Sequence, residues 1–172
     1  MTTTLQGALR PDADRLAVHF ERRYPATPAE VWSAITEPDR VARWLAPLTM
    51  VAEDRYRLDF GDDHATTGEV LRCDAPHALV VTWDFPGEPT SRVDVEVRPD
   101  GDGALLVLDH TRLPLDQGAG YGAGWEAHLA GLEALVRDAP APDWDERFAA
   151  LLPAYREAAA AANDVRAGSA SA

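Results

Sequence analysis

Alternating hydrophobic and polar positions are the clearest pattern in this sequence. Leu16, Val18 and Phe20 alternate with small or polar residues, which is the two-residue period of a strand with one buried face. Residues 92 to 98 show the same period, with three valines on one face and charged side chains on the other. Between residues 48 and 113, apolar runs alternate with turn-forming clusters at 61–63, 74–76, 86–89 and 99–103. This region therefore predicts an antiparallel meander.

Helical spacing follows the first strand and returns after the meander. Thr27 can cap a short helix that begins at Pro28, and Pro38 ends that helix and begins another. Residues 125–136 place apolar side chains along one stripe, as in a long amphipathic helix. We expect an α+β domain over residues 15–138, in which a curved antiparallel sheet of about six or seven strands wraps around this C-terminal helix.

The two ends of the chain show weaker patterns. Residues 1–14 have no period, so we expect a flexible leader there. Residues 143–162 carry another apolar stripe interrupted by Pro153, which predicts a broken extra helix. We expect this extension to pack on the domain, or on a second subunit to form a homodimer. Residues 163–172 are small and polar, and we expect them to be flexible.

Composition and charge narrow the classes of function. With 172 residues, 46% hydrophobic and 26% charged, the chain resembles one globular domain. Its formal net charge of -13 repels phosphate backbones and anionic lipids, which disfavours nucleic-acid and membrane partners. Cys73 is the only cysteine, the N-terminal residues do not resemble a secretion signal, and no apolar run approaches ~20 residues. We therefore expect a cytoplasmic protein without an intramolecular disulfide.

Several short strings occur in a consistent order along the chain. They are Ala29-Glu30-Val31-Trp32, Thr36-Glu37-Pro38, Arg43-Trp44-Leu45, Gly68-Glu69-Val70, the run from Leu79 to Trp83, the run from Gly103 to Thr111, and Gly124-Trp125. In this order and spacing, the chain from about Arg15 to Val136 resembles the bacterial branch of the family named for the activator of the ninety-kilodalton heat-shock protein's ATPase. That family lies within the SRPBCC (START-like) superfamily.

The resemblance implies a helix-grip fold with a cavity between the sheet and the long helix. Members of the superfamily bind lipids, hormones or polyketides, and some act as cyclases or ring oxygenase domains. The eukaryotic namesake is a co-chaperone. Because one fold hosts all of these activities, the function has to be argued from the site.

Five residues are our candidates to face that cavity: Trp83, His110, Tyr121, Trp125 and His128. Trp83 and Trp125 could both line it, because an apolar ligand needs aromatic walls. His110 is in register with buried leucines, where an imidazole must be hydrogen-bonded or functional. The alternative is a core histidine whose partners are all satisfied. His128 follows Trp125 by three residues and shares its helix flank.

Other aromatic residues are weaker candidates. Trp32, Trp44 and Tyr56 could also face the cavity, and for the two tryptophans we expect a place in the core.

A glycine-rich segment precedes the long helix. Gly118, Gly120 and Ala123 match a dinucleotide-binding fingerprint, but that fingerprint needs a parallel βαβ unit, and an antiparallel meander precedes this segment. The alternative is a flexible flap that gates the cavity mouth. We therefore expect no cofactor.

Motifs for metal binding and nucleophilic catalysis are missing from the sequence. The five histidines lack HxH or HxxxH spacing, so no metal site is predicted. No serine lies in a GxSxG-like elbow, and Asp109 and His110 point to opposite faces of one strand, which prevents a direct dyad. A carboxylate such as Asp59, Glu69 or Asp84 keeps acid-base catalysis open.

Three functions follow, in order of preference. The first is non-catalytic binding of a small hydrophobic or amphipathic ligand, including an aromatic one, in the cavity. The second is a chaperone-associated, partner-binding protein; it carries less weight because the residues before Arg15 are too few for the separate N-terminal domain of the eukaryotic activator. The third is a cyclase- or hydrolase-like enzyme that uses His110 or a carboxylate as a proton donor.

Overall fold

The computed structural model describes residues 2–171, which form one curved antiparallel sheet and four helices. The strands are β1 (Gly7–Asp12), β2 (Arg15–Tyr24), β3 (Leu48–Ala52), β4 (Arg55–Asp59), β5 (Ala65–Asp74), β6 (Ala78–Trp83), β7 (Ser91–Asp100) and β8 (Gly103–Leu113). The helices are α1 (Pro28–Thr36), α2 (Pro38–Val41), α3 (Gly118–Val136) and α4 (Trp144–Ala170). Within the described range, no helix is long and apolar enough to cross a bilayer.

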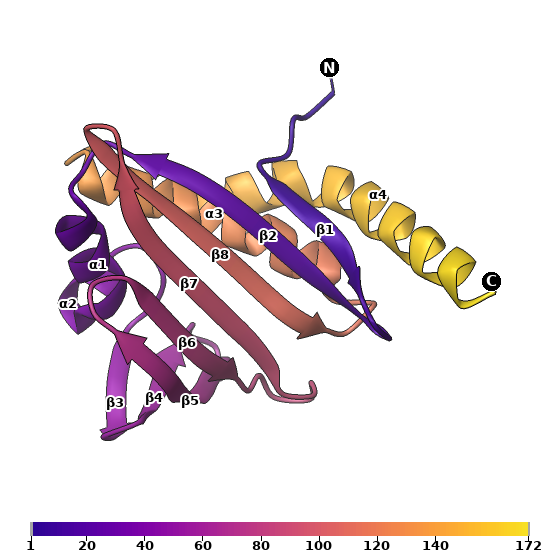
Figure 1. Cartoon of the computed structure of the whole chain (residues 1–172), viewed down its shortest axis with the longest axis horizontal. Coiled ribbons are helices and arrows are strands. Elements are labelled where there is room, and N and C mark those ends of the chain that lie inside the picture. The colour runs from indigo at the N-terminus through magenta and orange to yellow at the C-terminus, as the bar shows by residue number, and fades with distance from the viewer. Residues whose placement is uncertain (1, 172) are drawn as a thin grey trace.

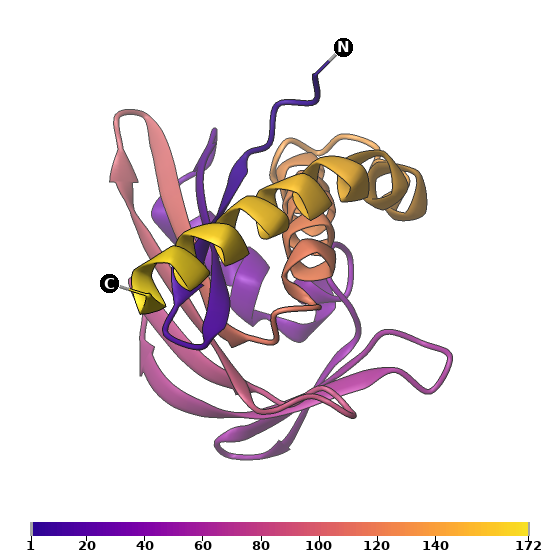
Figure 2. The ribbon, with the colours of Figure 1, turned by 90° about the vertical axis from the view of Figure 1, so that its right-hand side faces the viewer.

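The curved sheet wraps around helix α3. Its strand order is β1-β2-β8-β7-β6-β5-β4-β3, and α3 lies in the hollow of its concave face (Figures 1 and 2). The inward residues of β2, Leu16, Val18 and Phe20, are fully buried there. The valines of β7 pack beside them in the same core. The α+β class and the helix-grip fold are therefore confirmed, and the sheet has eight strands in the described residues where six or seven were expected.

Helix α1 begins as the sequence predicts. Thr27 Oγ1 accepts a hydrogen bond from the Glu30 backbone N–H at 3.2 Å, and Glu30 Oε2 accepts one from the Thr27 N–H at 2.9 Å. This reciprocal capping satisfies two backbone donors that the first turn cannot pair internally. The next helix, α2, begins at Pro38, as predicted.

The flexible leader expected over residues 1–14 is wrong where β1 lies. Gly7–Asp12 pairs with β2, from Gly7 opposite Phe20 to Asp12 opposite Arg15. Because β1 is an edge strand, Pro11 is tolerated there without its backbone donor. The strand was missed because it is only partly buried, so its hydrophobic alternation is weak. Met1 lies outside the described residues.

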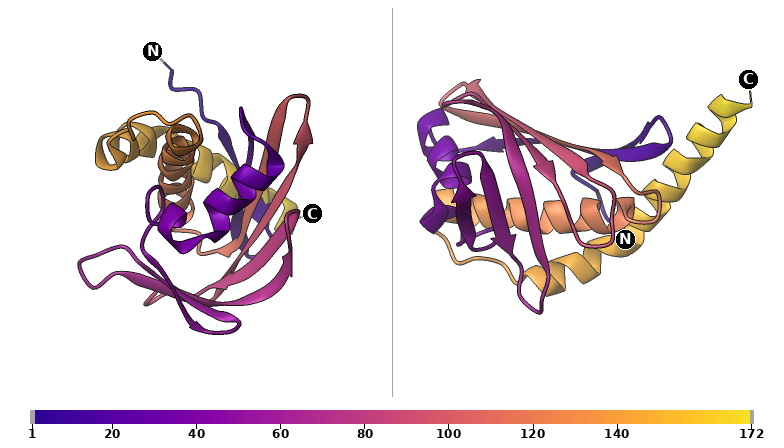
Figure 3. Two further views of the ribbon diagram at one scale, coloured as in Figure 1. Left: turned by 90° about the vertical axis from the view of Figure 1, so that its left-hand side faces the viewer. Right: turned by 90° about the horizontal axis from the view of Figure 1, so that it is seen from below.

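The break expected at Pro153 is also wrong, because α4 continues through it to Ala170. A proline inside a helix costs about 3 kcal/mol, but Leu151, Tyr155 and Ala159 form a buried stripe that spans it. The helix packs on α3 and β1, so it contacts its own domain, which was the first of the two predicted arrangements. Its C-terminal end extends past the sheet, so the flexible tail expected from residue 163 is helical as far as 170 (Figure 3). Ala172 lies outside the described residues.

The glycine-rich segment is not a flap but the first turns of α3. A Cβ at Gly118 would lie 2.6 Å from Leu16 Cδ1, and one at Gly122 would lie 2.4 Å from the Tyr155 ring. The glycines therefore let β2 and α4 approach the helix more closely than any side chain would allow.

Candidate functional site

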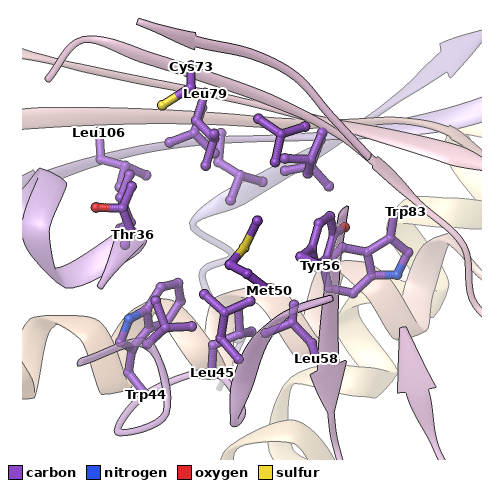
Figure 4. Close-up of a pocket in the computed structure, with 18 of the residues that line it drawn as sticks. Thr36, Trp44, Leu45, Met50, Tyr56, Leu58, Cys73, Leu79, Trp83 and Leu106 are labelled. Carbon is purple, nitrogen blue, oxygen red and sulfur yellow. The ribbon is translucent and has the colours of Figure 1, made fainter. Parts of the chain in front are cut away.

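A cavity of about 300 Å³ lies between the concave face of the sheet and α3, and we call it the inner cavity. Its lining comes from α1, α2, α3 and strands β3 to β8. Most of that lining is hydrocarbon, including Leu45, Leu58, Leu79 and Leu106 (Figure 4). Met50 is 46% exposed and projects among these side chains from the edge strand β3 (Figure 4).

Few polar groups line the inner cavity, and most of their protons are already used. Thr36 Oγ1 donates to the Trp32 carbonyl at 2.7 Å, and Tyr56 Oη donates to the Thr82 carbonyl at 2.5 Å. Burial, together with the charge of Asp84, raises the pKa of Tyr56, which keeps the phenol neutral. Glu53 and Cys73 are exposed, so they lie where the lining meets solvent. The interior suits an apolar body, and only its rim offers polarity.

A second hollow of about 810 Å³, which we call the aromatic cleft, lies beyond Trp44, Trp83 and Trp125. These three tryptophans, together with Leu45, line both hollows and so form their shared boundary. Residues 42–47, the turns after β4 and β6, the first half of α3 and the start of α4 form its walls. Four of the five tryptophans of the chain line the cleft, since Trp144 joins the other three.

The rings of the cleft contact one another in a chain. The ring centroids of Trp83 and Trp125 are 5.6 Å apart, and those of His128 and Trp144 are 5.2 Å apart. Trp144 in turn stacks on Phe148 at 4.8 Å with an interplanar angle of 15°. Such contacts fix the orientation of each ring and form a continuous aromatic wall.

The five predicted site residues fall into three groups. Trp83 and Trp125 line both hollows, whereas Tyr121 and His128 line only the aromatic cleft. His110 lines neither and is fully buried. That these five residues bind a ligand stays a prediction.

His110 has partners for both ring nitrogens. Trp125 Nε1 can only donate, so His110 Nδ1 accepts that bond, at 2.9 Å, and the ring proton lies on Nε2. Nε2 donates to Ser91 Oγ at 2.7 Å, which donates in turn to the Trp83 carbonyl at 3.2 Å. Burial lowers the pKa of His110 to about 3, so the imidazole is neutral. The geometry favours the core-histidine alternative.

His128 and Tyr121 are also held in place. His128 Nδ1 donates to the Trp44 carbonyl at 3.1 Å, and burial lowers the pKa of His128 to about 4 despite that bond. Tyr121 Oη donates to Glu88 Oε2 at 2.6 Å. Burial first, and then Glu88, raise the pKa of Tyr121. Both side chains therefore face the cleft as uncharged groups.

The structure adds residues that sequence reasoning missed. Trp44, expected in the core, lines both hollows, and its Nε1 donates to the Ala34 carbonyl at 2.8 Å. Trp144 and Phe148 come from the extension, where their four-residue spacing was visible but their destination was not. Phe60 and Phe85 lie beside turns, where no periodicity marks a buried face.

The three carboxylates proposed as acid-base groups do not lie together in one site. Asp59 lines the aromatic cleft, whereas Glu69 and Asp84 line neither hollow. Glu69 binds Arg55 instead, and Asp84 accepts a hydrogen bond from the Thr90 hydroxyl. Among residues 2–171, no three His, Cys, Asp or Glu side chains cluster in a way that could hold a metal ion.

Comparison with known proteins agrees with this architecture. The family model described as "Activator of Hsp90 ATPase homolog 1-like protein" matches residues 25–137. The crystal structure of CalU16 from Micromonospora echinospora is similar at 27% identity and a TM-score of 0.75, over 91% of this chain and 99% of that one. No curated protein is close enough in sequence to count as a relative.

Two further solved structures are similar at comparable identity. The solution structure of the protein encoded by BPP1335 from Bordetella parapertussis has 28% identity and a TM-score of 0.68, over 90% of this chain and 94% of that one. DynU16, described as a protein in the dynemicin biosynthetic locus, has 29% identity and a TM-score of 0.67, over 77% of this chain and 51% of that one.

Proposed function

Since this chain belongs to the Activator of Hsp90 ATPase homolog 1-like family, we propose that it binds a small, largely apolar molecule in the inner cavity without converting it. One observation carries the proposal: a hollow of about 300 Å³ lined by hydrocarbon, with its hydroxyl protons already donated to backbone carbonyls. An unfilled apolar hollow forfeits packing contacts, and an apolar ligand restores them.

The lining restricts the chemistry of this ligand. Its body is hydrocarbon or aromatic, because a polar atom in the interior would lose its hydrogen bonds with water without replacement. A polar end is accommodated only at the rim, beside Glu53 and Cys73. The similarity to DynU16, a protein from a biosynthetic locus, supports a small organic molecule as the ligand class.

The same geometry argues against catalysis at the residue that sequence reasoning favoured. His110 uses both ring nitrogens inside the protein, so neither is free to transfer a proton to a ligand. The Tyr56 phenol keeps its proton, because burial raises its pKa. These observations favour binding over turnover.

Filling the inner cavity is expected to abolish binding. Leu79→Trp places an indole in the cavity, whereas Leu71→Trp, on the exposed face of β5, makes the same change outside it. With the uncharged fluorescent probe N-phenyl-1-naphthylamine, we expect Leu79→Trp to weaken binding at least about tenfold, or ~1.4 kcal/mol. Fluorescence titration measures the affinity, and circular dichroism checks the fold.

The Leu71→Trp control is expected to bind the probe as the unaltered chain does. Equal affinity in both variants would place the probe elsewhere and reject the inner cavity as its site. In that case the partner-binding hypothesis would gain weight.

A further inference from the structure

We propose that the aromatic cleft is a second binding site, and that its ligand is a planar aromatic molecule carrying a positive charge. This inference is separate from the proposed ligand of the inner cavity. It rests on the rings and the charges of the cleft and on the position of the Trp83 indole.

The first observation is the wall of accessible rings. Phe60, Phe85, Trp144 and Phe148 are only partly buried, although each lines the same hollow. Single exposed hydrophobic residues are ordinary, but a continuous patch of them in a concave surface marks a place where something binds. Flat, stacked walls such as Trp144 on Phe148 select a planar partner.

The second observation is the charge of the lining. Four carboxylates line the cleft, namely Asp59, Asp62, Glu88 and Asp145, whereas Arg43 is the only arginine among the lining residues. The negative faces of tryptophan rings attract cations, and the carboxylates add to that attraction. His128 does not oppose it, because burial holds its pKa near 4 and the ring is neutral. An anionic ligand would meet repulsion from the same groups.

Glu88 is the carboxylate best placed to contact a bound cation. It is partly buried, and it accepts the Tyr121 hydroxyl at 2.6 Å. That bond holds the carboxylate against an aromatic wall, where its charge is screened less than that of the exposed Asp59, Asp62 and Asp145.

The third observation is the position of the Trp83 indole. Trp83 is only 6% exposed, and its nitrogen is turned away from the other side chains of the inner cavity (Figure 4). It lies near the Tyr121 hydroxyl, which lines the cleft. The Trp83 ring therefore joins the aromatic wall of the cleft, and the faces of such rings attract a cation.

The cleft depends on a helix beyond the family match. Trp144 and Phe148 belong to α4, whereas the family model ends at residue 137. The inner cavity, by contrast, is lined entirely by residues within that match. The second site therefore extends beyond the matched residues through Trp144, Asp145 and Phe148.

The test compares three probes of similar shape on the full chain: the cation 1-methylquinolinium, the anion 1-naphthoate and the neutral 1-methylnaphthalene. By isothermal titration we expect 1-methylquinolinium to bind most tightly, and we expect added salt to weaken it. Glu88→Gln and, separately, Trp144→Ala should each weaken it by about fivefold or more. Glu96→Gln, on an exposed position of β7 outside the cleft, is the matched control and should leave it unchanged.

Two outcomes overturn the proposal. If 1-naphthoate or 1-methylnaphthalene binds as tightly as 1-methylquinolinium, the positive charge has no role. If both Glu88→Gln and Trp144→Ala, checked for folding by thermal melting, bind the cation normally, the cleft is not its site. Glu88→Gln, whose side chain does not line the inner cavity, should leave the binding of N-phenyl-1-naphthylamine unchanged, which separates failure of this site from failure of the inner cavity.

Discussion

Tyr155→Ala is expected to lower the free energy of unfolding by about 3–5 kcal/mol, the usual cost of deleting a buried aromatic side chain. Tyr155 is fully buried, and its ring lies directly against Gly122 of α3. Its hydroxyl accepts the Gly7 N–H at 3.0 Å and donates to Glu126 Oε2 at 2.5 Å. One side chain therefore ties α4 to both α3 and β1.

One milder variant separates the ring from the hydroxyl, and a second serves as a control on the same helix. Tyr155→Phe keeps the ring but leaves the Glu126 carboxylate and the Gly7 N–H short of a partner, which costs about 1–3 kcal/mol. Phe148→Ala, on the same helix but partly exposed, is expected to cost less than Tyr155→Ala. Urea denaturation followed by tryptophan fluorescence measures all three. If Tyr155→Ala cost no more than Phe148→Ala, α4 would not be anchored as described.

Acid is expected to destabilise the protein, because burial keeps His110 from taking up a proton in the fold. In the unfolded chain His110 takes up a proton near its ordinary pKa of 6.5, whereas burial keeps it neutral in the fold down to about pH 3. Between these values the unfolded state binds more protons, so stability falls as the pH falls from 6.5 towards 3. At pH 4.5, two units below the ordinary pKa, His110 alone accounts for a loss of about 3 kcal/mol relative to neutral pH.

The contribution of His110 is isolated by comparing variants across pH. His110→Gln keeps an acceptor for Trp125 and a donor for Ser91 but cannot titrate. The stability lost between pH 7 and pH 4.5 should therefore be about 3 kcal/mol smaller in His110→Gln than in the unaltered chain. His77→Gln, at an exposed position, should leave that loss unchanged. Equal losses in all three proteins would show that His110 is not held neutral by the fold.

Hydrophobic periodicity predicted those strands and helices that bury one face and expose the other. The β7 strand alternates buried valines with solvated charged residues, so its period can be recognised without knowing which strands pair with it. The β1 strand and helix α4 are different, because β1 pairs with β2 and α4 packs on α3 and β1. The hydrogen bond from Gly7 to Tyr155 joins residues far apart in sequence. A pattern over a few neighbouring residues cannot predict such a contact.

The candidate site was predictable only where it belongs to one regular element. Trp83 and Trp125 could be placed because each occupies an inward position of a strand or a helix. The aromatic cleft, in contrast, collects residues from turns, from a linker and from α4, which share no period. His110 was identified as a buried polar group, but only the geometry shows that Ser91 and Trp125 satisfy it.

The boundary formed by Trp44, Trp83 and Trp125 between the two hollows has a thermodynamic consequence. A ligand in one hollow that shifts any of these indoles changes the free energy with which a second ligand binds in the other hollow. Linkage then requires the reverse effect to be of equal size, so each ligand alters the affinity for the other by one common factor. Titrating either ligand in the presence of the other measures that factor from both directions.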